Sequence, residues 1–377
     1  MTAWTRGCFP LGTTTTPRTR IWHSILFDVG DTEYPSGTTV NDRYVLEKKL
    51  GSDGQVYKAH DKHLDRTVAF KLLEPTSGGQ PQTWDEARRL ERLRSTFIVP
   101  VLNADIVLNS DLRYIVTPLV EGGDLESLAR PDGLPVSLAV RYGHQIAAGI
   151  DTVHASGMVH RDIKPANALV NGDNVFVSDV EFCNILDGDG LAPRNGSWCT
   201  LAPEAAPDSG FCSIATDVYS IAATVFFLLS GEYPVDHRIP RAEQQILIAA
   251  GRIRNITDAA PHVPRSVAAV VRRGLSMAPA ARHASAAAFG NALATSLGSR
   301  RDWHRVRHDG HEYCALSTAT RRRGPLGVCS EHISRREVIV RAFHMPSGRA
   351  VSGVATRTVI NSSLSTSLRS LFTDLSD

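Results

Sequence analysis

The sequence predicts an α+β fold followed by a smaller α+β module, within a chain of 377 residues. Residues 43–49, 68–71 and 114–116 have the pattern of short strands. Residues 136–157 then show the amphipathic pattern typical of a long helix. After residue 300, strand-like segments precede an amphipathic helix at 363–375. Early strands followed by long helices indicate an α+β fold.

The composition is that of a globular protein and argues against several classes. Hydrophobic residues make up 42% of the chain and charged residues 21%, so an ordinary core is expected. The formal net charge of +2 gives no indication of a nucleic-acid partner. The six cysteines are scattered, which favours a reducing cytoplasm over a disulfide scaffold. The longest apolar run, 221–229, is too short to cross a bilayer, and we expect neither a membrane segment nor a signal peptide.

The chain is expected to divide into three segments. Residues 1–39 are rich in Thr, Gly and Pro and are predicted to be disordered. Residues 40–299 contain the motifs described below. Residues 300–377 match no motif, and their pattern predicts a small α+β module with strands at 311–318, 326–329, 337–344 and 351–360 before the final helix.

A charged cluster lies between two apolar runs at residues 159–170, V-H-R-D-I-K-P-A-N-A-L-V. This arrangement predicts a short catalytic loop between buried elements. Asp162 is suited to accept a proton from a hydroxyl, and Lys164 to neutralise a transferring phosphoryl group. Asn167 is suited to hold a metal ion. Together these residues predict a phosphoryl-transfer site.

The same run matches H-R-D-[LI]-K-P-x-N, so the chain resembles the protein kinase family, in particular the bacterial Hanks-type serine/threonine kinases. Lys164 is typical of the Ser/Thr-specific members. The resemblance implies a two-lobed kinase fold. The N-lobe, 40–117, would hold an antiparallel sheet plus one helix, and the hinge and mainly helical C-lobe would occupy 118–299. The implied reaction transfers the γ-phosphoryl group of ATP to Ser or Thr hydroxyls of protein substrates, the kinase itself included.

The nucleotide-binding motifs of the family follow in order, with one departure. Residues 50–59, L-G-S-D-G-Q-V-Y-K-A, keep only G-x-x-G-x-V of the expected G-x-G-x-x-G-x-V. Either the loop is two residues short, or Lys49 stands where the first glycine belongs. Residues 68–71, V-A-F-K, resemble the strand whose lysine contacts the α and β phosphates. The ATP-binding residues that the resemblance implies are Gly51, Gly54, Val56, Ala69, Lys71, Pro118, Val120, Asp124 and Leu169.

A helix is expected over residues 83–94, where apolar residues recur at helical spacing. Its W-D-E-A-R-R-L matches the family helix at Glu86, the implied partner of Lys71. Asp85 and Glu91 are alternative carboxylates on the same helix, and Glu86 would then be an exposed helix charge.

Asn167 and Asp179 are the Mg²⁺ ligands that the resemblance implies. Asp179 begins D-V-E where the family has D-F-G. Val180 replaces an aromatic residue that packs beneath the helix carrying Glu86, and Glu181 replaces a flexible glycine. These changes predict a stiffer, differently packed switch that retains its metal site.

Residues 182–204 match the activation segment, which ends in G-S-W-C-T-L-A-P-E. Between residues 179 and 196 there is no Ser, Thr or Tyr. The usual phosphate that pairs with the H-R-D arginine, here Arg161, therefore has no acceptor in that stretch. We expect Arg161 to meet Asp187, Asp189 or nothing.

Three contacts with a positioning role are also implied by the resemblance. Ser197 would bond the catalytic aspartate and lysine. Asp217 would hold the catalytic loop from the start of a buried helix, and Arg282 would pair with Glu204 of A-P-E.

Other classes of function stay open at this level. The short glycine loop and D-V-E are compatible with a pseudokinase scaffold that binds nucleotide or partners without turnover. A small-molecule phosphotransferase is a second alternative, against which the A-P-E segment argues. In a third, the C-terminal module carries the function as a binding domain.

The C-terminal module contains two His/Cys pairs, His311-x-x-Cys314 and Cys329-x-x-His332, with His304 and His308 upstream. Two such pairs at this separation are compatible with one Zn²⁺ ion. The alternative is that the cysteines are core residues of strands and the histidines lie on the surface.

Overall fold

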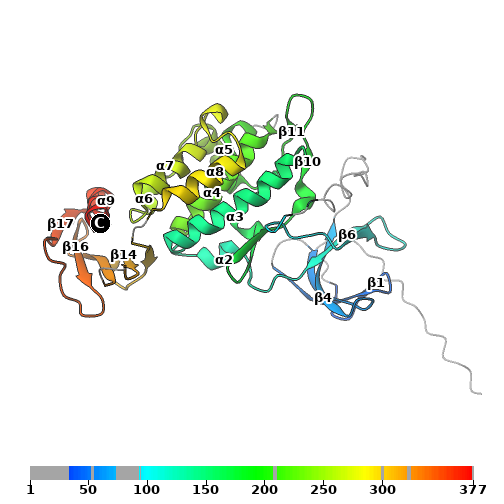
Figure 1. Ribbon diagram of the computed structural model, residues 1–377, viewed down its shortest axis with the longest axis horizontal. Helices are drawn as coiled ribbons and strands as arrows, with labels where there is room; N and C mark the ends of the chain where they lie inside the picture. Colours follow the sequence, from blue (N-terminus) through cyan, green and yellow to red (C-terminus); the bar gives the residue numbers. More distant parts are fainter. Residues whose placement is uncertain are drawn as a thin grey trace, which may run out of the picture.

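The computed structural model describes residues 34–51, 55–73, 93, 95–206, 210–298, 301–320 and 324–375. The predicted helix at 83–94 lies outside the described residues, apart from residue 93. In Figure 1 the helical lobe separates the N-terminal sheet from the C-terminal module. Among the described helices, none has both the length and the apolar character needed to cross a bilayer.

The N-lobe is a six-stranded antiparallel sheet in the order β1-β2-β3-β4-β6-β5. Its strands alternate buried and partly exposed residues, so one face forms the lobe core. Tyr44, Phe70 and Tyr114 pack their rings together at the centre of that core. The strands are β1 (Thr39–Val40), β2 (Tyr44–Lys49), β3 (Gln55–Asp61), β4 (Arg66–Leu73), β5 (Asn103–Ile106) and β6 (Arg113–Pro118).

Residues 34–38 pack against this sheet and Thr39 begins its first strand, which corrects the prediction that disorder extends to residue 39. The Tyr34 ring meets the Tyr57 ring edge-on and is 8% exposed. The Gly37 amide donates to the Leu46 carbonyl at 2.8 Å, and Thr39 pairs with Val45. Burial of the tyrosine ring and strand pairing fix a segment whose own composition indicated disorder.

The C-lobe is built around α3 (Val136–Ala155) and α4 (Ile214–Ser230), which pack against each other. Nearly all of α4 is buried, because its apolar residues surround the helix and leave no solvent face. Shorter helices cover this pair: α2 (Leu125–Ala129), α5 (Arg241–Ala249), α6 (Ile256–Ala259), α7 (Arg265–Gly274) and α8 (Ala286–Ser296).

Short strand pairs frame the segments that carry the predicted catalytic residues. β7 (Met158–Val159) pairs with β10 (Asn184–Ile185), and β8 (Ala168–Asn171) pairs with β9 (Asn174–Val177). A third pair joins β11 (Ala192–Pro193) to β12 (Phe211–Cys212). Short 3₁₀ turns lie between them: η1 (Pro165–Asn167), η2 (Val180–Phe182), η3 (Trp198–Thr200) and η4 (Pro203–Ala205).

The C-terminal module is a five-stranded antiparallel meander covered on one face by a helix. The four predicted strands are present, but the last covers only Arg357–Ile360 of the predicted 351–360. A further strand, β13, was missed because its residues W-H-R-V show no alternation and depend on pairing with β14. The Phe372 ring of the helix meets Trp303 and Tyr313 of the sheet. The elements are β13 (Trp303–Val306), β14 (His311–Ser317), β15 (Leu326–His332), β16 (Glu337–His344), β17 (Arg357–Ile360) and α9 (Leu364–Leu375).

The module contacts the C-lobe at the end remote from the N-lobe sheet (Figure 1). Asp302 accepts hydrogen bonds from the Ser137 amide and hydroxyl at 2.8 and 2.6 Å. Ser137 lies in the first turn of α3, whose N-cap position holds a proline with no capping side chain. A carboxylate from the module therefore satisfies the start of the helix that leads to the catalytic loop.

Candidate active site

The catalytic loop is held from below by the buried carboxylate of Asp217, as expected. Its oxygens accept from the amides of His160 and Arg161 at 2.8 and 3.0 Å. His154 of α3 approaches the same carboxylate at 2.8 Å. Burial would raise the pKa of Asp217, but the hydrogen bond and charge of His154 outweigh it, so the pKa is lowered. Asp217 is therefore ionised and fixes the loop backbone.

Above this support, Asp162 is surrounded by three side chains that set its orientation. One carboxylate oxygen accepts from the Ser197 amide and hydroxyl at 2.9 and 2.7 Å. The other accepts from the Asn167 side-chain amide at 2.9 Å and lies 3.1 Å from the Lys164 ammonium. Lys164 also donates to the Ser197 hydroxyl at 3.0 Å. The four residues come from the catalytic loop and the activation segment, so both segments fix one cluster.

The charge of Asp162 follows from these contacts. The residue is 6% exposed, and burial alone would raise its pKa. The positive charge of Lys164 and the Ser197 hydrogen bond outweigh burial and lower the pKa. The carboxylate is thus ionised and able to accept a hydrogen bond from a hydroxyl.

Gly196 permits the activation segment to approach the catalytic loop closely. Its φ is +116°, and a Cβ atom at this position would lie 2.1 Å from the Arg161 carbonyl oxygen. No other residue type fits here without moving one of the two segments. The glycine therefore sets the distance between Ser197 and Asp162.

Lys71 lies between two carboxylates of the D-V-E segment. Its ammonium donates to Asp179 at 3.0 Å and forms an ion pair with Glu181. Asp179 has a left-handed backbone, with φ of 59°, at the start of η2. The resemblance gave Asp179 a role as a metal ligand, and it gave Glu181 no role. The signal was present, because a carboxylate had replaced the glycine next to an expected cation.

The charges of Lys71, Glu181 and Asp179 affect one another's pKa values. Burial would lower the pKa of Lys71, but the charges of Glu181 and Asp179 raise it. The pKa of Glu181 is raised, first by burial and then by the charge of Asp179. Lys71 is therefore held as an ammonium ion by two acidic residues. Glu86, its predicted partner, lies outside the described residues.

Residues predicted to bind ATP share the face of the N-lobe sheet opposite its core. In β4, Val68, Phe70 and Leu72 are buried in the core, so Ala69 and Lys71 alternate to the other face. Val56 pairs directly with Lys71 across β3 and β4 and shares this face.

The other predicted ATP contacts lie where the chain passes between the lobes. Pro118 ends β6, and the partly exposed Val120 follows it. Leu169 is partly exposed in β8, which begins three residues after Pro165 of the catalytic loop. Gly51 is described, with φ of +73°, whereas Gly54 lies outside the described residues.

Asp124, the predicted ribose contact, already has partners. Its carboxylate accepts from the Ser127 amide at 2.8 Å and from the Ser127 hydroxyl at 3.0 Å. These bonds cap the first turn of α2. A ribose contact would have to share the carboxylate with this cap.

The Arg161 side chain is directed to the backbone of the activation segment. It donates to the carbonyls of Phe182 and Pro193 at 2.7 and 2.8 Å. Asp187 instead accepts from the amides of Asp189 and Leu191. These two carbonyls were not foreseen as Arg161 partners. Their hydrogen bonds to Arg161 hold the activation segment in a stretch that has no residue able to accept a phosphate.

Two further expectations concern packing around the site. Val180 lies in a small apolar cluster with Ile98, Val153 and Met158, so the aromatic residue of D-F-G is replaced by a compact buried side chain. Arg282 donates to both carboxylate oxygens of Glu204, at 2.6 and 2.7 Å, as predicted. This fully buried guanidinium ties the end of the activation segment to the C-lobe.

Comparison with known proteins agrees with this geometry. Residues 44–292 match the model of the protein kinase domain family. A protein of Clostridium perfringens named as a probable serine/threonine-protein kinase is 29% identical over 66% of this chain and 38% of its own length. PknL of Mycobacterium tuberculosis, a serine/threonine-protein kinase, is 29% identical over 70% of this chain and 68% of its own. PknH of Mycobacterium bovis is 30% identical over 64% of this chain and 42% of its own.

The aligned region covers between about two fifths and two thirds of the length of these relatives. The family match covers well over half of this chain and includes both the N-lobe sheet and the C-lobe helices. It also includes Asp162, Ser197 and Asp217, whose contacts form the cluster described above. The chain therefore belongs to the protein kinase family and is similar to bacterial serine/threonine protein kinases.

Proposed function

We propose that this chain transfers the γ-phosphoryl group of ATP to Ser or Thr hydroxyls of protein substrates. The observation that carries the proposal is the cluster around Asp162. Both oxygens of its carboxylate already have polar partners, which come from Lys164, Asn167 and Ser197. Catalysis of phosphoryl transfer depends mainly on positioning and charge stabilisation. A preformed cluster of this kind supports turnover better than nucleotide binding alone.

Each residue has a role that follows from its contacts. Asp162 would accept the hydrogen bond of the attacking hydroxyl and take up its proton as the new P–O bond forms. Lys164, beside Asp162 and Ser197, would stabilise charge that develops on the phosphoryl oxygens. Lys71 would hold the α and β phosphates from the face of the N-lobe sheet. Adenine would lie near Val56, Ala69, Leu169 and the 118–120 segment.

The donor set near Asp162 fits Mg²⁺. Asp179 supplies a carboxylate, and Asn167 directs its amide nitrogen to Asp162, which leaves its amide oxygen on the other side. Mg²⁺ prefers such hard oxygen ligands together with phosphate oxygens. When bound, the ion would neutralise phosphate charge, and Asp179 and Asn167 would hold it. Lys71 already offsets part of the charge of Asp179.

We also propose protein substrates, autophosphorylation and a cytoplasmic location. The A-P-E segment, tied down through Glu204 and Arg282, is the part that receives a peptide in this family. Autophosphorylation sites would lie outside residues 180–195, where the chain has no hydroxyl. Free thiols at Cys183, Cys199 and Cys212 agree with a reducing compartment.

The test is incorporation of labelled γ-phosphate from ATP and Mg²⁺ into the protein and into generic substrates. Wild type is compared with Asp162→Asn, and with Asp173→Asn as a control whose carboxylate is 83% exposed. We expect labelling by wild type and by the control, and a loss of at least about 100-fold in Asp162→Asn. Mass spectrometry would then locate the phosphorylated residues.

A wild-type protein that binds ATP without labelling itself, peptides or small alcohols would overturn the proposal in favour of a nucleotide-binding scaffold. Labelling of small alcohols alone would indicate a small-molecule phosphotransferase.

A further inference from the structure

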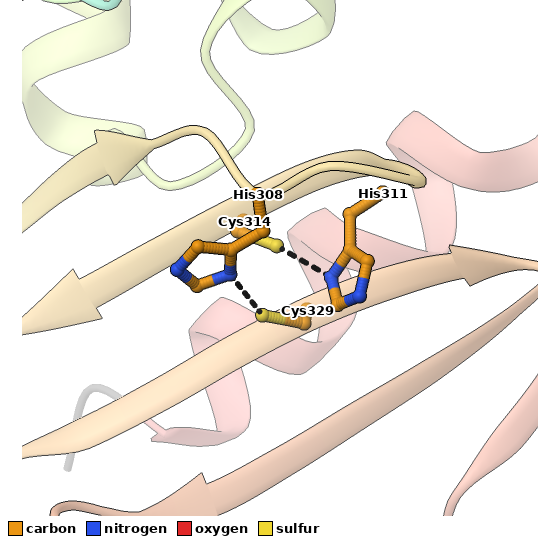
Figure 2. A group of neighbouring side chains, drawn as sticks. All are labelled: His308, His311, Cys314 and Cys329. Carbon is orange, nitrogen blue, oxygen red and sulfur yellow. Dashed lines mark hydrogen bonds between the residues drawn. The ribbon is translucent and has the colours of Figure 1, made fainter.

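Four metal-binding side chains converge in the C-terminal module, far from the phosphoryl-transfer cluster. His308, His311, Cys314 and Cys329 each direct one ligand atom inward, and these atoms all lie within 4.8 Å of one another. Figure 2 shows the two imidazoles and two thiols pointing toward a common centre. The His311 Nδ1 atom lies 3.1 Å from Cys314 Sγ, and His308 Nδ1 lies 3.4 Å from Cys329 Sγ.

The strand register explains how residues distant in sequence meet. Cys314 of β14 and Cys329 of β15 are directly paired, so both side chains emerge on the same face. A register shift between His311 and Tyr313 marks a bulge, which alters the direction of the strand at His311. His308 comes from the turn between β13 and β14.

The cysteines are not part of the module's hydrophobic core. Tyr313, Ala315 and Val328, their neighbours in the strands, are core residues on the face that α9 covers. Strand alternation therefore directs Cys314 and Cys329 to the opposite face. They are nevertheless only 1% and 8% exposed. The interpretation of strand cysteines in a core does not explain burial on this face beside two imidazoles.

The four residues differ from the set that the sequence motif suggested. His332 is not in the cluster, because its Nε2 atom lies 3.1 Å from the Glu312 carboxylate. His308 takes its place, which gives the order H-x₂-H-x₂-C-x₁₄-C. Cys329 and His332 do not act as a pair, because a strand directs residues three positions apart to opposite faces.

We propose that His308, His311, Cys314 and Cys329 bind one Zn²⁺ ion. Two thiolates and two imidazoles form a common tetrahedral zinc set, with bonds of about 2.0–2.3 Å. Such bonds imply ligand–ligand separations of about 3.3–3.8 Å. The observed 3.1 and 3.4 Å contacts already lie close to this range. Small shifts of the side chains would complete the tetrahedron.

Four protein ligands leave no open position, so the site is structural and not catalytic. The ion would join the β13–β14 turn to the β14–β15 pair. The turn also carries Arg307, whose guanidinium contacts Asp132 of the C-lobe at 2.7 Å. Zinc would therefore fix the turn that contributes this contact between the module and the kinase domain.

The same two thiols suggest a competing chemistry. Directly paired strand cysteines lie within the Cα separation that a disulfide requires. Both thiols are free in this structure. A disulfide would consume the two sulfur ligands, so the two interpretations exclude each other and thiol state distinguishes them.

The experiment uses the full chain, purified with reductant, without chelator, from zinc-supplemented cells. We expect elemental analysis to find about one zinc per chain in wild type. Cys314→Ser and Cys329→Ser should contain almost none, and His308→Asn and His311→Asn should bind Zn²⁺ at least about 100-fold more weakly. His332→Asn is the matched control and should retain full zinc content.

A second measurement does not depend on how the variants fold. Wild type stripped of metal is titrated with Co²⁺, and tetrahedral coordination with thiolate ligands should give strong visible bands and near-ultraviolet charge transfer, which Zn²⁺ then abolishes. Absence of both zinc and these bands in reduced wild type would overturn the proposal. A Cys314–Cys329 disulfide in protein purified under reducing conditions, or full zinc in Cys314→Ser, would also overturn it.

Discussion

The Lys71 ammonium forms an ion pair with Glu181, a residue that occupies the glycine position of the D-F-G segment. The same ammonium donates to Asp179 at 3.0 Å. The phosphate-binding lysine and the candidate metal ligand are thus joined by a third, acidic group. Because two carboxylates face one ammonium, the cluster has an excess of negative charge where the phosphates of ATP are expected.

Glu181→Gln should strengthen ATP binding. The change removes one negative charge near the phosphates and frees Lys71 from a competitor. A gain of about 1 kcal/mol, or about fivefold in Kd, is expected. Isothermal titration with ATP and Mg²⁺ measures it. Glu47→Gln, at a surface pair with Lys58 in the same lobe, is the control and should leave Kd unchanged. Weaker ATP binding in Glu181→Gln would mean that Glu181 positions Lys71 productively.

Gly196→Ala should lower the rate of phosphoryl transfer. Its Cβ would lie 2.1 Å from the Arg161 carbonyl, so the activation segment must move and Ser197 must leave Asp162. We expect kcat to fall by more than about tenfold, as for loss of a positioned catalytic contact. Gly190→Ala is the control, since Gly190 has a φ of +75° but open space around its Cβ position. Equal effects of the two substitutions on kcat would contradict the close-approach argument.

Asp217→Asn should destabilise the fold and do so in a pH-dependent way. The buried carboxylate accepts two loop amides and contacts His154, so its loss should cost about 3 kcal/mol at pH 7. The pKa of Asp217 is lowered in the folded state. Its contribution is therefore present above its unfolded pKa of about 4 and is lost as the pH falls toward the folded value.

Denaturant unfolding of wild type and Asp217→Asn at several pH values between 7 and 3 would test this sign. The difference in unfolding free energy should be constant at neutral pH and shrink below about pH 4. Asp173→Asn removes an exposed carboxylate and should change stability by less than about 0.5 kcal/mol at every pH. A difference that grows in acid would reverse the assignment of Asp217 as ionised.

Asp302→Ala should destabilise α3 through its first turn. The carboxylate accepts from the Ser137 amide and hydroxyl, and the helix has no capping side chain of its own. A loss of about 1 kcal/mol is typical for a removed cap. Thermal unfolding measures it, with Asp374→Ala as a control whose carboxylate is 54% exposed and 4.0 Å from Arg357. An unchanged midpoint in Asp302→Ala would show that water replaces the cap.

Much of the kinase domain was predictable because its information is local. The run from His160 to Asn167 has fixed spacing, and the contacts of Asp162 with Asn167 and Lys164 follow from residues within one loop. Strand alternation in β4 likewise explains why Lys71 and Phe70 face opposite sides of the sheet. The contacts of Ser197, Asp217 and Glu204 were predictable as well, since the resemblance assigns each a partner.

The contacts that were missed join segments whose approach no local pattern encodes. Glu181 and Lys71 are 110 residues apart in the sequence. They meet because the turn η2 directs the Glu181 side chain toward β4, which carries Lys71. Arg161 meets backbone carbonyls, which have no sequence signature. The strand β13 exists because β14 pairs with it.

The sequence by itself determined the fold class, the order of the motifs and the identity of the catalytic loop, because periodicity and fixed spacing act over a few residues. Only the tertiary structure decided which carboxylates face Lys71 and which histidine joins Cys314 and Cys329. Those choices depend on strand register and on side-chain direction. A shift of one residue in a strand sends a side chain to the other face, as the exclusion of His332 shows. His308 instead joins the cluster from the turn between β13 and β14.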